Sequence, residues 1–180
     1  ILIPTFNEEK NITFVLEELH NEGYKNITIL DANSSDQTVK IAEDFNCKII
    51  LDNDDIKGFG GSVINGLDKL DSEYFCIFDG DGSFNPKDII EMKKKVSEGY
   101  DFVFGSRYIN EEISEDDDIY SKFGNFFFTK LVNVLFRIDT TDVLFLYVLG
   151  KREDFLSLNL HSNDYRICTE ILLKCYINFS

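Results

Sequence analysis

Two aspartates separated by one glycine form the stretch of this chain best suited to chemistry. Asp79 and Asp81 directly follow the short apolar run 74–78, which is typical of a buried strand. Gly80 and Gly82 let the backbone turn sharply there, so we expect both carboxylates to converge on one point outside a sheet. A divalent cation would relieve their mutual repulsion, and hard oxygen ligands suit Mg²⁺ or Mn²⁺ better than zinc.

The same stretch admits other interpretations. Asp and Gly are common in turns, so the residues could form a simple solvated loop. An EF-hand loop starting at Asp79 is excluded, because its sixth position is Phe84 instead of Gly and its twelfth is Ile90 instead of Glu. The loop also resembles the nucleophile loop of haloacid-dehalogenase-type phosphatases, in which one Asp attacks and the second acts as acid. The later Gly-Asp-x-x-x-Asp metal motif of those phosphatases is not found after Ser83.

The composition indicates one globular domain and limits its partners. The 180 residues are 43% hydrophobic and include 17 Phe, which is enough for a single core. A net charge of -15 argues against nucleic acid, whose phosphates need a basic protein face. Four cysteines without Cys-x-x-Cys spacing are interpreted as reduced core residues of a cytosolic protein. No signal peptide and no uncharged 18-residue window is seen, so no segment is expected to span a membrane.

Apolar runs alternate with helical patterns along the first 110 residues. Strands are expected at 1–3, 27–30, 47–51, 74–78 and 102–105, with helices between them. This alternation predicts crossover connections and a mostly parallel sheet with helices on both faces, a single α/β domain of Rossmann-like type. Such sheets bind ligands outside the carboxyl ends of their strands. Polar residues follow the expected strands at 4–8, Asp31, 52–57, 79–81 and 106–107, so they should share one rim.

The second half of the chain is first acidic and then strongly apolar. Residues 110–118 hold six acids in nine positions, which predicts a solvated loop or, alternatively, a lid over the site. Residues 121–136 follow a helical pattern in which Phe, Leu and Val occupy more than one core-facing stripe. This segment is interpreted as a packed helix or homodimer face, or as an interfacial helix that rests on a bilayer. A last helix is expected over 166–176.

Five motifs stand in a fixed order along the first 110 residues. They are Pro4-Thr5-Phe6-Asn7-Glu8, Leu30-Asp31-Ala32-Asn33-Ser34-Ser35-Asp36-Gln37-Thr38, Lys57-Gly58-Phe59-Gly60-Gly61-Ser62, Asp79-Gly80-Asp81-Gly82-Ser83-Phe84-Asn85-Pro86 and Gly105-Ser106-Arg107-Tyr108. Together they resemble the motifs of the inverting nucleotide-sugar glycosyltransferases of family two, and within them the dolichol-phosphate mannose synthases. The resemblance implies a GT-A type domain that uses a GDP- or UDP-hexose donor with Mg²⁺ or Mn²⁺.

The resemblance also implies a set of site residues. Base and ribose would be contacted near Phe6 and Asp31, while Asp79 and Asp81 would bind the donor diphosphate through the metal, with Ser83 as a further metal ligand. The nucleotide-sugar site would comprise Pro4, Thr5, Phe6, Glu8, Asp31, Lys57, Gly58, Asp79, Gly80 and Asp81. A cation at this place would stabilise the charge that develops on the leaving nucleoside diphosphate.

The expected acceptor is a polyprenyl (dolichyl) phosphate at the cytoplasmic face of a membrane, where the protein would make peripheral contact. Its phosphate needs a cation, for which Arg107 is the first candidate, with Lys130 and Arg137 weaker ones. A hydroxyl acceptor on a glycan is the rival and would need a general base. The candidate bases are Asp142, Asp164 and Glu170, and the catalytic set is predicted as Asp81, Arg107, Asp142 and Glu170.

Three positions depart from the family pattern. Ala32 replaces the second acid of an Asp-Asp pair, and Ser83 stands where the mannose synthases commonly have Gln. The stretch 142–148 keeps the acid of Asp-x-x-Ser-Gly-Phe-Arg but loses the Ser-Gly and the Arg. A non-catalytic nucleotide-binding module is therefore a further alternative. We expect one domain over 1–180, trimmed at both ends, with a nucleotide-sugar-binding half over 1–110 and an acceptor-side half over 111–180.

Overall fold

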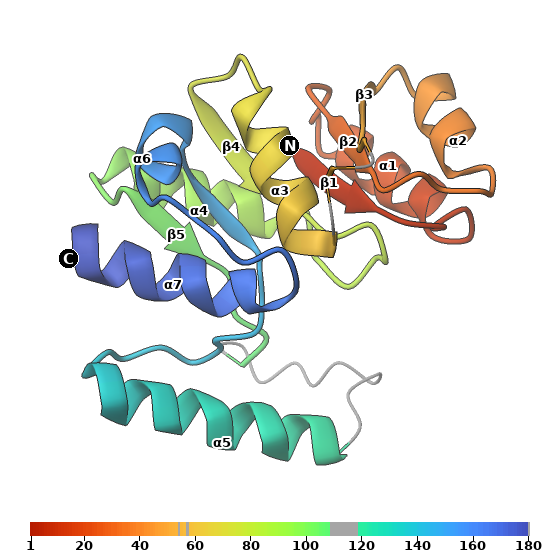
Figure 1. Cartoon of the computed structure of the whole chain (residues 1–180). Helices are drawn as coiled ribbons and strands as arrows, with labels where there is room; N and C mark the ends of the chain where they lie inside the picture. Colours follow the sequence, from red (N-terminus) through yellow and green to blue (C-terminus); the bar gives the residue numbers. More distant parts are fainter. Residues whose placement is uncertain (54, 57, 109–118, 180) are drawn as a thin grey trace.

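A six-stranded sheet lies at the centre of the computed structural model, which describes residues 1–53, 55–56, 58–108 and 119–179 (Figure 1). The strands are β1 (Leu2–Thr5), β2 (Thr28–Asp31), β3 (Lys48–Leu51), β4 (Tyr74–Ile77), β5 (Phe102–Phe104) and β6 (Val148–Lys151), in the order β3-β2-β1-β4-β6-β5. Strands β1 to β4 are parallel, and β6 is antiparallel to both β4 and β5. The expected mostly parallel sheet is confirmed.

Helices connect and cover these strands. They are α1 (Ile12–Asn21), α2 (Thr38–Asp44), α3 (Gly58–Asp68), α4 (Asp88–Ser97), α5 (Ile119–Phe136), α6 (Arg152–Ser157) and α7 (Arg166–Phe179). The sequence patterns did not predict β6, because its residues belong to one short continuous apolar run over 143–149 without alternation. β6 inserts between β4 and β5, so the second half of the chain completes the sheet of the first.

Both faces of the sheet are buried under helices. Leu2 and Leu30 lie in one cluster with residues of α3, α6 and α7. Their neighbours Ile3 and Ile29 lie in the opposite cluster, with residues of α1, α2 and α4. Because side chains alternate along a strand, burial of both faces requires strands that are apolar at nearly every position. The cysteines are unpaired; Cys47 is half-buried and the other three are buried.

Helix α5 lies below the main body in Figure 1. In contrast to an ordinary amphipathic helix, it buries polar side chains and exposes apolar ones. Its buried residues include Asn125, Thr129 and Val132, which share one face at helical spacing. Its exposed residues are mainly apolar: Phe126, Phe127, Phe128, Leu131, Val134, Leu135 and Phe136. The predicted helix is confirmed. It packs on the body through residues such as Val132, but most of the apolar side chains described at 124–136 are exposed, so the interpretation as a fully packed helix is wrong. The dimer face and the interfacial helix stay predictions.

The described helices and the acidic stretch bear on two expectations from the sequence. Among the described residues, no helix is both long and apolar enough to cross a bilayer. The acidic stretch 110–118, expected as a loop or lid, lies outside the described residues.

The first turn of α3 packs against the loop that precedes α7. The Gly60 and Gly61 N–H groups donate to the Asn163 carbonyl over 3.0 and 3.3 Å. A Cβ atom at Gly60 would lie 2.2 Å from the Ser162 carbonyl oxygen, a distance at which backbone atoms must move apart. This close approach is a packing reason for glycine at that position.

We predict that Gly60→Ala lowers the free energy of unfolding by roughly 1–3 kcal/mol, because the added methyl group overpacks a backbone contact. Gly124→Ala is the matched control, since Gly124 lies in α5 with nothing within 4 Å of its Cβ position. That variant should gain up to about 1 kcal/mol from helix propensity. Urea unfolding of both variants measures the difference, and equal effects would contradict the described packing.

Candidate active site

A cavity of about 660 Å³ opens at the carboxyl ends of β1 and β4. Its wall includes the carboxylates of Asp79 and Asp81, the cation Arg107, and aromatic rings that include Phe59 and Tyr165. A somewhat larger cavity, of about 760 Å³, runs along β5 and α7 but is lined by none of these three charged side chains. The chemistry therefore points to the smaller cavity, at the rim where parallel sheets bind ligands.

The turn after β4 holds the two aspartates at this cavity. Gly82 has φ +88°, a left-handed conformation that favours glycine. The Ser83 N–H donates to Asp81 Oδ1 over 2.8 Å and fixes that side chain. Burial raises the pKa of Asp79 to about 6, and the charge of Asp81 adds to the increase. The two carboxylates therefore repel each other as expected, and Asp79 is the one pushed towards its neutral form.

This pair fits a hard divalent cation. Both candidate ligands are carboxylates, Ser83 lines the same cavity, and a cation would offset the burial and repulsion that raise the Asp79 pKa. Among the described residues, no group of three or more His, Cys, Asp or Glu gathers around a common point. One or two carboxylates together with substrate phosphates are the usual protein environment of Mg²⁺.

The ends of β1 and β2 are joined by a buried carboxylate. Asp31 is fully buried and accepts hydrogen bonds from the Ser34 N–H at 2.7 Å, the Ser34 hydroxyl at 2.5 Å and the Thr5 hydroxyl at 3.1 Å. Its bonds fix the loop that carries Ala32. As a ribose ligand Asp31 stays a prediction.

The remaining predicted donor-site residues differ in their relation to the cavity, and of those that the structure describes only Pro4 is among its lining residues. Pro4 lines the cavity, and Gly80 packs against β1, with its Cβ position 3.3 Å from Thr5. Phe6 is 60% exposed, and its contact with the base stays a prediction. The Glu8 carboxylate accepts from the Asn11 amide over 3.1 Å. Gly58 begins α3, whereas Lys57 lies outside the described residues.

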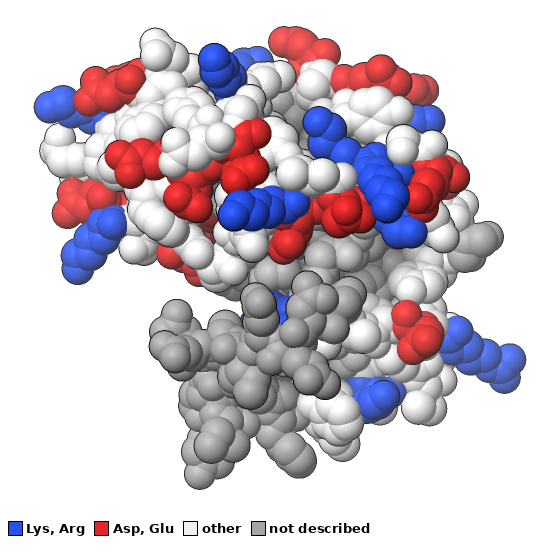
Figure 2. Space-filling view, turned by 180° about the vertical axis from the view of Figure 1, so that it is seen from behind, with Lys and Arg blue, Asp and Glu red and all other residues white. Residues whose placement is uncertain are grey.

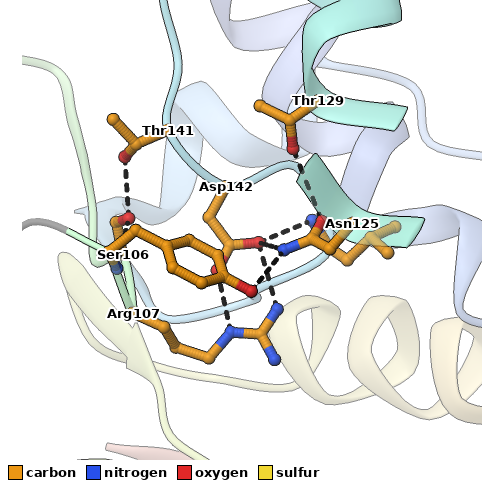
Figure 3. Close-up of polar contacts among 8 residues, drawn as sticks. Ser106, Arg107, Asn125, Thr129, Thr141 and Asp142 are labelled. Atoms are coloured by element: carbon orange, nitrogen blue, oxygen red, sulfur yellow. Dashed lines mark hydrogen bonds and ion pairs between the residues drawn. The ribbon is translucent and has the colours of Figure 1, made fainter. Parts of the chain in front are cut away.

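Arg107 is held at the cavity by a buried ion pair (Figure 3). Its Nε and Nη2 atoms donate to the two oxygens of Asp142 over 2.8 and 3.1 Å. The Asp142 side chain has no exposed surface, whereas that of Arg107 is 29% exposed. Asp142 Oδ1 also accepts from Asn125 of α5 over 2.9 Å and from the Leu144 N–H over 3.2 Å. Two residues predicted separately from the sequence thus form one unit.

Glu170 and Asp164 make contacts within the chain. Glu170 accepts from the His161 and Ser162 N–H groups over 3.0 and 2.8 Å and pairs with Lys174 over 2.8 Å. Burial alone would raise its pKa, but these hydrogen bonds lower the pKa to about 2. Asp164 pairs with Arg166 over 2.8 Å, which lowers its pKa. As general bases both stay predictions, yet their described contacts anchor the loop that touches α3.

Sequence reasoning missed Asn125 and the aromatic pair at the cavity mouth. Phe59 of α3 and Tyr165 stack with ring centroids 4.8 Å apart, and both line the cavity. Phe59 stands within the glycine-rich motif, but nothing in the sequence indicates its contact with Tyr165, because the two residues lie far apart in the chain. For Asn125 a signal exists: Asn125, Thr129 and Asn133 repeat every four residues through a mainly apolar helix.

The fold is that of solved nucleotide-sugar transferases. The crystal structure of glucosyl-3-phosphoglycerate synthase from Mycobacterium tuberculosis with Mn²⁺, UDP and phosphoglyceric acid aligns with a TM-score of 0.77 and 17% identity, covering 99% of this chain and 63% of that one. The single α/β domain is thus of the GT-A type, as expected from the sequence.

Residues 1–157 match the model of glycosyl transferase family 2, so the chain belongs to that family. Glycosyltransferase AglJ of Haloferax volcanii is 30% identical over 176 residues, or 97% of this chain and 57% of that protein. The UDP-N-acetylglucosamine–dolichyl-phosphate N-acetylglucosaminyltransferase of Methanococcus voltae is 30% identical over 196 residues, covering 96% of this chain and 78% of that protein. The chain therefore spans only part of each relative. The family excludes the phosphatase alternative.

Glu170→Gln should lower the free energy of unfolding at pH 7 by on the order of 2 kcal/mol, because it removes a carboxylate stabilised by its donors. A carboxyl whose folded pKa is about 2 stabilises the fold above its ordinary pKa of 4.5 and loses this contribution as the pH falls towards 2. The gap between variant and wild type should therefore narrow below pH 4.5.

Glu98→Gln is the control, since Glu98 forms an exposed ion pair with Lys95. Its stability should stay near that of the wild type at every pH, because exposed pairs contribute little. Urea titrations at pH 7, 5 and 3 supply the measurement. A gap for Glu170→Gln that does not change with pH would contradict the assigned role of its charge.

Proposed function

We propose that the protein transfers a hexose from a nucleoside-diphosphate sugar to a polyprenyl phosphate, with inversion at the anomeric carbon and with Mg²⁺ or Mn²⁺. The observation that carries this proposal is that one cavity is lined by both the Asp79 and Asp81 carboxylates and the Arg107 guanidinium. The carboxylates suit a metal-bound diphosphate, and the guanidinium suits a second, anionic substrate. Two phosphate-bearing substrates would thus meet in one space.

An acceptor that is already an anion needs no general base, and the candidate bases are all engaged in contacts within the chain. Asp142 is buried and engaged by Arg107, Asn125 and the Leu144 N–H. Glu170, with a pKa of about 2, has little tendency to take a proton, and Asp164 is paired with Arg166. A phosphate oxygen attacks without a base, whereas a hydroxyl acceptor would need one. We therefore assign Asp142 to positioning Arg107.

The outer face of α5 supports a lipid acceptor. Phe127, Leu131, Val134 and Leu135 are 43–76% exposed there. Lys130 lies beside this face with its ammonium group 5.7 Å from the Phe126 ring centre, and Arg137 follows the helix. Apolar residues flanked by basic ones are typical of helices that lie in a membrane interface. On the face seen in Figure 2, the Asp and Glu side chains drawn in red lie mainly on the upper body.

The relatives agree with this choice in part. The Methanococcus voltae protein is named for a dolichyl-phosphate acceptor and a UDP-linked donor. We infer that this chain takes a substrate of the same class, and that it meets the lipid at the cytoplasmic face of a membrane. A hydroxyl of a lipid-linked glycan is the rival acceptor.

The transfer itself exchanges one bond for another. An acceptor phosphate oxygen forms a bond to the anomeric carbon while the bond from that carbon to the donor diphosphate breaks, and the leaving nucleoside diphosphate keeps the electron pair. Arg107 holds the acceptor phosphate and fixes its approach. Asp79 and Asp81 would hold the cation, which when bound neutralises charge on the leaving group.

We expect the chain to form a lipid-linked hexose when it is incubated with Mn²⁺, dolichyl phosphate in detergent, and either UDP-N-acetylglucosamine or GDP-mannose. Asp81→Ala and Arg107→Leu should each lower the rate by about 100-fold or more, because each removes stabilisation of a charged group. Mass spectrometry of the lipid product measures the transfer. Lys95→Leu, at an exposed lysine on α4, serves as a control for loss of positive charge. Transfer to a glycan hydroxyl but not to the phosphate would contradict the proposed acceptor.

Membrane contact through α5 can be measured separately. The double variant Phe127→Ser with Leu135→Ser should bind phosphatidylglycerol vesicles with an affinity lower by roughly tenfold or more, because two large apolar side chains are no longer available for burial in the membrane. Ile90→Ser is the matched control, because Ile90 on α4 is 54% exposed, comparably to the α5 residues. Vesicle co-sedimentation gives the affinities. If the double variant instead dissociates a dimer and binds vesicles normally, α5 is a dimer face.

A further inference from the structure

Helix α5 contacts the body of the protein through amide side chains. The Asn133 amide donates to the Thr140 carbonyl over 2.8 Å, and its oxygen accepts from the Thr140 N–H over 3.2 Å. Two turns earlier, the Asn125 amide reaches Asp142. The helix is thus held along the segment 140–142 by two polar contacts of different kinds. One is purely structural, and the other touches the carboxylate that binds Arg107.

The Asn125 contact has a defined geometry (Figure 3). Its Nδ2 atom donates to Asp142 Oδ1 over 2.9 Å and to the Tyr108 hydroxyl over 3.1 Å, which uses both of its hydrogens. Its Oδ1 atom accepts from Thr129 over 3.4 Å. Because a carboxylate only accepts, the nitrogen must face Asp142. Asn125 is 5% exposed, so water does not replace these bonds at little cost.

These bonds bear on the orientation of the cation. The terminal torsion of an aspartate is soft, so an Asp carboxylate rotates unless several donors hold it. In Asp142, Oδ1 accepts from Asn125, from Nη2 of Arg107 and from the Leu144 N–H, while Oδ2 accepts from Arg107 Nε. Asn125 is the only side-chain donor to Asp142, among the described residues, that is not on Arg107 itself. Without it the carboxylate turns more easily, which weakens the two-point pairing that helps to direct the guanidinium at the cavity.

We propose that Asn125 is a positioning residue for the acceptor, acting through Asp142 on Arg107. This inference rests on the function proposed above, in which Arg107 binds the acceptor phosphate. Because Asn125 lies on the inner face of α5 and the apolar residues lie on its outer face, the seating of α5 on a lipid surface and the direction of Arg107 are mechanically linked. Asn125 itself touches neither substrate.

The test compares Asn125→Leu with Asn133→Leu. Both variants replace an amide on the same face of α5, buried at Asn125 and half-buried at Asn133, by an apolar side chain of similar size, but only the first loses a donor to Asp142. Asn125→Leu should lower kcat/KM for dolichyl phosphate by about tenfold or more, the effect of losing a hydrogen bond to a charged group. Calorimetric affinity for UDP with Mn²⁺ should stay within about twofold in both variants, because the donor side is untouched. Asn125→Gln, which keeps the amide donor, should recover part of the loss.

A second readout does not depend on turnover. The Arg107 Nε–H signal in ¹⁵N NMR spectra, identified by its loss in Arg107→Lys, reports the ion pair directly. Asn125→Leu should shift this signal and speed its hydrogen exchange, and Asn133→Leu should leave it in place. An unchanged Arg107 signal in Asn125→Leu, or equal losses of kcat/KM in both variants, would overturn the inference. The wild type could be inactive while the Arg107 signal still responds as expected. That result would contradict the proposed function and the acceptor role of Asn125, but it would support the link from Asn125 to Arg107.

Discussion

The buried ion pair between Arg107 and Asp142 is the interaction on which the proposed acceptor side of the structure depends. Asp142 has no exposed side-chain surface, so its charge is tolerated only because Arg107, Asn125 and a backbone N–H surround it. Removing one partner of such a pair costs roughly 3–5 kcal/mol, because the other charge is left unpaired. The pair joins the segment after β5, the helix α5 and the segment before β6. It also keeps a cation at a cavity that carries two carboxylates.

Much of the fold could be predicted from the sequence because the sheet is buried on both faces. Strands such as 27–30 are apolar at nearly every position, and the helices between them have clear periodicity. β6 escaped prediction, since its pairing with β4 and β5 depends on contacts far apart in the chain. The outward direction of the α5 apolar residues could be stated only as one of several alternatives, a dimer face or an interfacial helix. Periodicity shows that a helix has an apolar side, but it does not show whether that side packs on the protein or is exposed to solvent.

The candidate site was predictable where function depends on residues adjacent in sequence. Asp79 and Asp81 follow one strand, and strand order brings Pro4 and Arg107 to the same cavity. The pairing of Arg107 with Asp142 was not predictable, because 35 residues separate them. Glu170 illustrates the opposite limit. The family resemblance suggested a catalytic role, which stays a prediction, while the structure shows Glu170 bound to backbone N–H groups of a loop that supports α3.

The central claim is that the Asp79 and Asp81 carboxylates bind a nucleoside diphosphate through a divalent cation. The most direct measurement is calorimetric binding of UDP and GDP, each with and without Mn²⁺, to this chain and to Asp81→Ala. We predict that one nucleotide binds only when Mn²⁺ is present and that Asp81→Ala abolishes this binding. Binding that is equally strong without metal, or that survives in the variant, would contradict it.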